Sequence, residues 1–339
     1  MDGRPQQPPD SNLSLFAPES IALFASAIIN SVILALALLA AAQEPDVSFR
    51  AGATDVRLDV QAAVGPRIIA NLTKADFAIF DENLPQPISY FARETEPLSA
   101  VLLLDISGSM MRYLTPMADS SRQALAVLKP GDQAAIIVFD RETKVHRELG
   151  PNTSALEAEL RAAIRTKGLG SGSELNKSIR VAANYLRDKA PSGVGRRAVI
   201  VVTDLGSPNY QNPDEAVIKD LTAAGAVLNA IVAGKAQRPD PVKDRFVNDD
   251  FTPADVFKLA EETGGQVLRA EKADKSAEQL QDAPLRKMME GIRTRYTIAY
   301  KAPEARSGEF RRIRVELSED ARRRYPGAEI RVRRGYWAP

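Results

Sequence analysis

The stretch SAVLLLDISGSM, from Ser99 to Met110, decides the fold of this 339-residue chain. Its apolar run ends at Asp105, and Ser107 and Ser109 follow at alternate positions. A near-continuous apolar run of this length is typical of a strand buried on both faces of a parallel sheet. The stretch therefore predicts a buried strand that opens into a polar loop at its carboxyl end.

The same pattern continues along the chain. Further apolar, strand-like runs cover residues 133–140, 198–204, 226–233 and 265–270. Between them lie helical stripes, one over 117–128 and one over 179–186, and Gly225 and Gly264 mark the ends of two more predicted helices. This alternation predicts an α/β fold over residues 97–292: a doubly wound, mostly parallel, Rossmann-like sheet.

Residues 44–96 and 293–339 contain short alternating runs broken by Gly, Pro and Asn, which predict strands without helices. Each segment is too small to bury a core alone, so we expect the two to pack together as one accessory β-rich unit. The segment 293–339 carries thirteen Lys and Arg against six Asp and Glu. We interpret this basic segment as a solvated strand face, with a surface for anionic polymers or lipid headgroups as the alternative.

Residues 1–20 are polar and proline-rich, which predicts a disordered tail. Residues 21–42 contain no charged side chain and are long enough to span a bilayer as a helix. Residues 21–43 are thus a transmembrane anchor or a cleaved signal peptide. The run Ala40–Ala42 suits cleavage. The length of the stretch, and the lack of a net positive charge in residues 1–20, favour an anchor. Both predict export: residues 44–339 face the periplasm or the outside, or are secreted after cleavage.

The composition excludes several kinds of site. The chain has no cysteine and one histidine, His146, so disulfides, Cys-type zinc sites and multi-histidine metal sites are excluded. The net charge of +1 gives no indication of a nucleic-acid partner. No G-x-S-x-G, P-loop or G-x-G-x-x-G motif is present, and His146 falls in a predicted edge hairpin, where we expect an exposed residue. We therefore expect a protein that is not an enzyme, with metal-dependent hydrolysis as the alternative.

Asp204 ends the run 198–204 as Asp105 ends the first strand. Ligands of doubly wound sheets bind beyond the carboxyl ends of the strands, and two carboxylates there repel unless a cation lies between them. Together with Ser107 and Ser109 they form an all-oxygen donor set, which suits Mg²⁺, Mn²⁺ or Ca²⁺. Ser173 follows a glycine-rich loop over 168–172, and we expect it to cap the next helix, to join these donors, or to do both.

These residues resemble the von Willebrand factor type A family and its metal-ion-dependent adhesion site. The segment DISGS matches the D-x-S-x-S motif, Ser173 stands where the family usually has threonine, and Thr203 and Asp204 match its T-D pair. The family usually has glycine after that aspartate, whereas this chain has Leu205. The flanking segments, including AEIRVRRGYWAP at 328–339, resemble bacterial VWFA-related proteins of the acidobacterial type, so the resemblance covers about 47–339.

The resemblance implies that the serines bind the metal directly, that the aspartates often act through water, and that one coordination position stays open for a partner's Asp or Glu. We therefore expect a metal-ion-dependent protein-binding module for adhesion or assembly, with a divalent cation, preferably Mg²⁺, as its cofactor. A structural scaffold with a non-functional metal site is a further alternative. The expected partners are a protein with an acidic side chain and, through residues 21–42, a membrane, with no nucleic acid.

Overall fold

The computed structural model describes residues 55–93, 96–151, 155–193, 195–205, 208–210, 212–240, 251–270 and 283–338. The predicted tail and hydrophobic segment, residues 1–43, lie outside this part of the chain. Within the described ranges, no helix is long and apolar enough to cross a membrane. The described residues belong to one compact unit.

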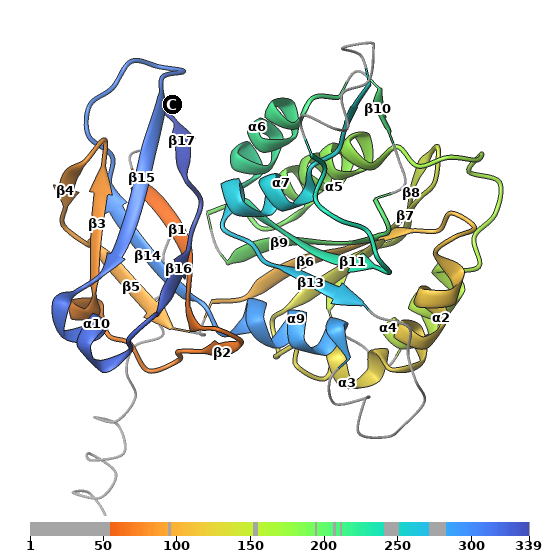
Figure 1. The fold of residues 1–339 in the computed structure, drawn as a ribbon, viewed down its shortest axis with the longest axis horizontal. Helices are drawn as coiled ribbons and strands as arrows, with labels where there is room; N and C mark the ends of the chain where they lie inside the picture. Colours follow the sequence, from red (N-terminus) through yellow and green to blue (C-terminus); the bar gives the residue numbers. More distant parts are fainter. Residues whose placement is uncertain are drawn as a thin grey trace, which may run out of the picture. The chain divides into compact units, whose positions relative to one another are not determined.

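A six-stranded sheet forms the centre of the α/β region (Figure 1). In order across the sheet, its strands are β13 (Val267–Ala270), β11 (Ala226–Ala233), β9 (Arg196–Thr203), β6 (Leu98–Asp105), β7 (Gln133–Phe139) and β8 (Thr143–Pro151). Neighbouring strands from β13 to β7 run parallel, and β8 pairs antiparallel with β7. The predicted doubly wound, mostly parallel sheet is confirmed.

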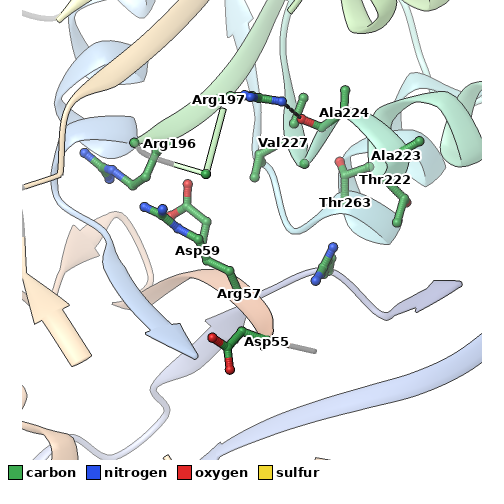
Figure 2. A pocket seen from close by; sticks show the side chains of 15 residues that line it. Asp55, Arg57, Asp59, Arg196, Arg197, Thr222, Ala223, Ala224, Val227 and Thr263 are labelled. Atoms are coloured by element: carbon green, nitrogen blue, oxygen red, sulfur yellow. Dashed lines mark hydrogen bonds between the residues drawn. The ribbon is translucent and has the colours of Figure 1, made fainter. Parts of the chain in front are cut away.

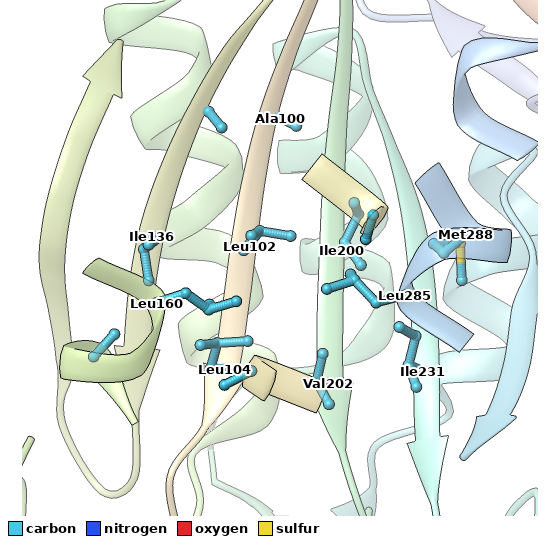
Figure 3. Packing of buried hydrophobic residues seen from close by; sticks show 14 of the residues in the cluster. Ala100, Leu102, Leu104, Ile136, Leu160, Ile200, Val202, Ile231, Leu285 and Met288 are labelled. Carbon is cyan, nitrogen blue, oxygen red and sulfur yellow. The ribbon is translucent and has the colours of Figure 1, made fainter. Parts of the chain in front are cut away.

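The composition of β6 explains its central place. All eight of its residues are buried, and successive side chains point to opposite faces. Ala100, Leu102 and Leu104 join one core cluster, as Figure 3 shows, while Val101 and Leu103 join the cluster on the other face. A strand that is apolar on both faces is stable only between two layers of helices.

Helices cover both faces of the sheet (Figure 1). The cluster of Leu102 includes residues of α2 (Met111–Asp119), α3 (Ser121–Leu125), α4 (Ala155–Ala163) and α9 (Pro284–Arg293). The other cluster includes residues of α5 (Leu175–Lys189), α6 (Asp214–Ala224) and α7 (Val256–Thr263). Two short strands, β10 (Pro208–Tyr210) and β12 (Phe251–Pro253), pair antiparallel.

The helical predictions are largely confirmed. The stripe over 179–186 lies buried on α5, and Gly225 and Gly264 end α6 and α7 in left-handed conformations with φ of 61° and 82°. The stripe over 117–128 was expected on one helix, but the structure divides it between α2 and α3. Helix α2 ends before Ser120, where the hydroxyls of Ser120 and Ser121 donate to the carbonyls of Met117 and Ala118 at 3.1 and 2.7 Å, and side-chain bonds of this kind compete with regular helix geometry.

The two flanking segments form one β-rich unit of two sheets, as predicted. The first sheet has the order β16-β1-β14-β5 with β2 beside β1, and the second has the order β17-β15-β3-β4. The elements are β1 (Asp55–Val64), β2 (Arg67–Ile68), η1 (Lys74–Asp76), β3 (Phe77–Asp81), β4 (Leu84–Gln86), β5 (Tyr90–Arg93), β14 (Tyr296–Lys301), β15 (Phe310–Leu317), α10 (Glu319–Arg324), β16 (Glu329–Arg331) and β17 (Gly335–Trp337). Each sheet takes strands from both segments, and a shared hydrophobic cluster fills the space between them.

Candidate functional site

The candidate site lies where the order of the strands reverses. The chain leaves β6 toward β7 and β8 on one side and continues in β9 and β11 on the other side. Asp105 is the last residue of β6 and Thr203 is the last residue of β9, its parallel neighbour. Side chains from two adjacent strand ends therefore meet at the position where open α/β sheets bind ligands.

Hydrogen bonds from three segments hold the buried carboxylate of Asp105. The Thr203 hydroxyl donates to Asp105 Oδ2 at 2.9 Å, and the backbone N–H of Ser107 donates to Oδ1 at 3.1 Å. The hydroxyl of Ser173 lies 3.2 Å from Oδ1 and 3.3 Å from Oδ2 and donates to the carboxylate. A hydrogen bond thus joins Asp105 and Thr203, which are 98 positions apart in the sequence. The surrounding donors fix the orientation of the carboxylate.

The two serines of the DISGS segment lie on the solvent side of this carboxylate. Ser107 is half-buried and Ser109 is exposed, and their hydroxyl oxygens are 3.4 Å apart. A turn in which the Met110 N–H donates to the Ser107 carbonyl at 3.0 Å brings the two hydroxyls to the same side. The alternate spacing in the sequence therefore brings two hydroxyls together, and that of Ser107 also contacts the buried carboxylate of Asp105.

Ser173 joins this cluster and does not cap a helix. Helix α5 begins at Leu175 with Glu174 as its N-cap residue, so Ser173 lies one residue before the cap. The N–H of Glu174 donates to the carbonyl of Asp140 at 3.0 Å, which joins the start of α5 to the residue that follows β7. This contact places the preceding Ser173 hydroxyl over Asp105.

Burial dominates the electrostatics of Asp105. Burial raises the pKa of the Asp105 carboxyl, hydrogen bonds from Ser107 and Thr203 lower it in part, and the negative charge of Asp204 raises it further. No cationic side chain of the described residues is among these causes. Within the described residues no three His, Cys, Asp or Glu side chains form a metal-binding group. A metal ion at this position would therefore depend on the serine hydroxyls as well as on the two carboxylates.

The structure places two further residues at this edge. The sequence identified Thr203 only as part of the T-D pair and assigned it no contact with Asp105. Its hydroxyl makes the shortest hydrogen bond to Asp105 among those described. Asp140 directly follows β7, and its Oδ1 atom is buried without a hydrogen-bond partner in the described structure. In the sequence, Asp140 follows an apolar run just as Asp105 does, so the same pattern could have predicted its place at this edge.

Leu205 occupies the position where the resemblance led us to expect glycine. Its φ of 61° is left-handed, a conformation that glycine adopts freely and leucine rarely adopts. The N–H of Leu205 donates to the Thr203 hydroxyl at 3.2 Å, and its side chain packs against the hydrophobic cluster around Leu103. The backbone turn after Asp204 is therefore retained although its usual residue is absent.

His146 lies on the edge strand β8, but it is not exposed as expected. Its side chain is 19% exposed, because the imidazole packs against α4 with Nε2 at 3.3 Å from a carboxylate oxygen of Glu159. The single histidine is therefore positioned against a helix and not beside Asp105.

One comparison with known proteins identifies a sequence family for this region. A sequence profile described as the von Willebrand factor type A domain matches residues 100–207. No curated protein sequence matches the chain at a significant level.

Solved structures with a similar fold include the conserved hypothetical protein BatB from Bacteroides thetaiotaomicron. It is 17% identical, with 58% of this chain and 100% of that chain covered and a TM-score of 0.43. A von Willebrand factor type A protein from Catenulispora acidiphila is 12% identical, with 85% and 73% covered and a TM-score of 0.43. The profile match covers most of β6, the DISGS segment, Ser173 and the Thr203–Asp204 pair, and on this ground the chain contains a von Willebrand factor type A domain.

Proposed function

We propose that the chain is a metal-ion-dependent protein-binding module, in which a divalent cation such as Mg²⁺ accepts an acidic side chain of a partner protein. The observation that carries this proposal is that Ser107 and Ser173 both contact the buried carboxylate of Asp105, and that the Ser109 hydroxyl lies 3.4 Å from the hydroxyl of Ser107. Asp204 adds a second negative charge to the same place. We infer that the adhesion or assembly role of this module is exercised outside the inner membrane.

The electrostatics of Asp105 support a cation. A carboxylate loses hydration when it is buried, and a second carboxylate nearby destabilises it further. Hydrogen bonds from hydroxyl groups offset only part of this cost, since the pKa of Asp105 stays above its ordinary value. A cation would offset the remainder, and oxygen donors favour the hard cations Mg²⁺, Mn²⁺ and Ca²⁺.

The number and kind of the oxygen donors support a bound cation with one coordination position left for a partner's carboxylate. Mg²⁺ requires about six oxygen ligands. Ser107, Ser109 and Ser173 would supply three, and Asp105 and Asp204 would hold ordered water. Uncharged hydroxyls leave the charge of the cation poorly neutralised, so a carboxylate from outside would bind strongly at the remaining position.

The metal-binding part of the proposal is tested by calorimetric titration of Mg²⁺ and Mn²⁺ into the full-length chain. Asp105→Ala should abolish binding, and Ser173→Ala should weaken it. The matched control is Ser171→Ala, an exposed serine of the loop that carries Ser173, which should bind metal as wild type does. Circular dichroism of each variant checks that the fold is retained. Equal metal affinity in Asp105→Ala and wild type would contradict the proposal.

The partner-binding part is tested by affinity capture from the envelope fraction in Mg²⁺ or in EDTA. Proteins captured by wild type in Mg²⁺, and lost both in EDTA and with Asp105→Ala, would support a partner bound through the cation. Replacement of the acidic residues of such a partner by amides should then abolish its capture. Partners recovered equally well in EDTA would show that the chain binds proteins through another surface.

A further inference from the structure

A cavity lies at the end of the parallel sheet opposite to Asp105, where β9 and β11 begin. Its volume is about 370 Å³. Its lining comes from β1, from the first residues of β9 and β11, from the end of α6, and from Arg333 between β16 and β17. Figure 2 shows Arg57 and Arg196 on one side of this cavity and Thr222 and Thr263 on the other.

The lining is strongly basic for so small a space. Its charged residues are Arg57, Arg196, Arg197, Arg333, Asp55 and Asp59. Asp59 forms an ion pair with the buried Arg295 at 2.9 Å, and Arg57 forms one with the buried Glu96 at 3.1 Å. Including these two partners, five arginines face three carboxylates, which leaves a surplus of two positive charges.

Backbone carbonyl groups accept hydrogen bonds from two of these arginines but do not neutralise their charge. Arg196 is 3% exposed and donates to the Ile292 carbonyl at 2.8 Å, and its Nε is buried without a hydrogen-bond partner in the described structure. Arg197 donates to the Ala224 carbonyl at 2.8 Å, at the end of α6. These acceptors satisfy N–H groups, but a neutral acceptor offsets little of the cost of a buried charge.

Arg333 is the least satisfied of these cations. Its Nε is buried without a hydrogen-bond partner, and within the described part of the chain it forms no ion pair. Its guanidinium group lies 5.9 Å from the centre of the Tyr336 ring. Burial lowers the pKa of Arg333, and both burial and the charge of Arg57 lower the pKa of Arg197. Within the described residues, Arg333 therefore lies in this cavity without an ion pair, and the neighbouring Arg57 and Arg197 repel one another.

We propose that this cavity binds a small oxyanion with two negative charges, of the phosphate class, through Arg333 together with Arg57 and Arg196. Such an anion matches the surplus of two charges, and guanidinium groups bind phosphate oxygens through paired N–H groups. Because β1 and Arg333 belong to the β-rich unit whereas Arg196 and Arg197 belong to the parallel sheet, the bound anion would stabilise the contact between the two. The phosphate group could be inorganic or part of a small phosphorylated compound.

Thermal unfolding and calorimetric titration of the full-length chain test this proposal. The chain is titrated with potassium phosphate, and separately with glycerol phosphate, at constant ionic strength in chloride and EDTA. Low millimolar anion keeps the general stabilising effect of phosphate salts small. Binding of both ligands would identify the phosphoryl group as the determinant, and binding of inorganic phosphate alone would exclude larger compounds.

Three variants make the test specific. Arg333→Gln should weaken phosphate binding by about tenfold or more, because a charge-assisted, bidentate contact is lost. Arg312→Gln, at an exposed position of β15, is the matched control and should bind as wild type does. Ala223→Glu keeps every arginine and adds a carboxylate at an exposed position of the lining, so it should raise the melting temperature without phosphate and abolish the response to it.

Two results would overturn the proposal. One is a wild-type chain whose melting temperature responds equally to phosphate and to chloride. The other is an equal phosphate response in wild type, Arg333→Gln and Ala223→Glu, which would show a general salt effect. If Arg333→Gln does not fold, the comparison of wild type with Ala223→Glu and Arg312→Gln decides the question alone.

Discussion

A single buried carboxylate, that of Asp105, dominates the electrostatics of the candidate metal site. Its pKa is raised above the ordinary value of 3.8, chiefly by burial. The folded chain therefore binds the proton of this group more tightly than the unfolded chain does. Without metal, the free energy of unfolding should fall as pH rises from 3.8 through the raised pKa, because the carboxylate then becomes charged in a site that disfavours the charge.

We therefore predict that Asp105→Asn is more stable than wild type in EDTA at neutral pH, and that this advantage disappears as pH falls below the ordinary pKa of aspartate. Saturating Mg²⁺ should reverse the order, since only wild type retains the carboxylate needed for the metal. Wild-type Mg²⁺ affinity should itself fall on acidification, because protons compete for Asp105. Urea unfolding over a pH series, with and without Mg²⁺, measures all three effects. A stability difference independent of pH would refute this account.

Leu205 shows a second effect at the residue scale, a side chain held in a strained backbone conformation. A left-handed φ costs a leucine roughly 1 kcal/mol, and the packing of its side chain offsets part of that cost. Valine at this position would keep apolar surface but add a branched Cβ, which fits the left-handed conformation worse. Glycine would lose the packing and relieve the strain.

We predict that Leu205→Val destabilises the chain by about 1–2 kcal/mol, whereas Leu205→Gly changes the free energy of unfolding by less than about 1 kcal/mol. Urea unfolding of the two variants measures the difference. The order is informative because packing alone predicts the opposite: valine preserves more buried surface than glycine. If glycine proves the more damaging substitution, packing outweighs backbone strain at this position.

At the scale of elements, the loop before α5 determines where the Ser173 hydroxyl lies. Gly168, Gly170 and Gly172 have φ values of 85°, 94° and 109°, which side-chain-bearing residues rarely adopt. A Cβ atom on Gly170 would also lie 2.9 Å from the Cβ of Arg141. The loop can therefore pass close to the end of β7 only with glycine at this position.

We predict that Gly170→Ala lowers stability by about 1–2 kcal/mol and weakens Mg²⁺ binding severalfold, because the loop shifts and moves Ser173 away from Asp105. Gly131→Ala is the matched control: its φ is 90° and a Cβ there meets no atom within 4 Å. It should lower stability by a similar amount and leave Mg²⁺ affinity unchanged. Equal Mg²⁺ affinity in the two variants would mean that the loop does not position the site.

At the scale of the whole molecule, a buried polar cluster joins the N-terminal and C-terminal flanks. Asp81 on β3 is fully buried and accepts hydrogen bonds from Tyr300 at 2.8 Å and Tyr336 at 2.9 Å. The guanidinium group of Arg311 lies 2.7 Å from Asp81 Oδ1 and completes the cluster. Burial and the hydrogen bond to Asp81 raise the pKa of Tyr336 to about 12, so its hydroxyl remains a donor throughout the neutral range.

We predict that Asp81→Ala destabilises the chain by about 3–5 kcal/mol, because it leaves the Arg311 charge and two hydroxyls buried without an acceptor. The double variant Asp81→Leu/Arg311→Met should be substantially more stable than Asp81→Ala, since it removes both charges. Chemical denaturation measures both, with the exposed Asp320→Ala as a control that should change stability by less than about 0.5 kcal/mol. A double variant as unstable as Asp81→Ala would indicate that the packing of these side chains, and not the pairing of their charges, stabilises the chain.

Much of the candidate site could be predicted from the sequence because its parts are local. An apolar run that ends in a carboxylate identifies a strand end, and alternate spacing brings Ser107 and Ser109 to one side of a turn. The role of Ser173 was left open between a helix cap and a metal donor. Only the hydrogen bond between Glu174 and Asp140, residues 34 positions apart in the sequence, decides that the helix begins later and that the hydroxyl meets Asp105.

The sequence by itself determined the class of fold, since strand and helix periods depend on neighbouring residues alone. It also determined that residues 44–96 and 293–339 pack together, because neither segment contains enough apolar surface to form a core alone. Only the tertiary structure decided the strand order, the contact of Thr203 with Asp105, and the gathering of arginines from β1, β9 and the segment before β17. Contacts between distant residues depend on how whole elements pack, and local residue patterns carry no information about that packing.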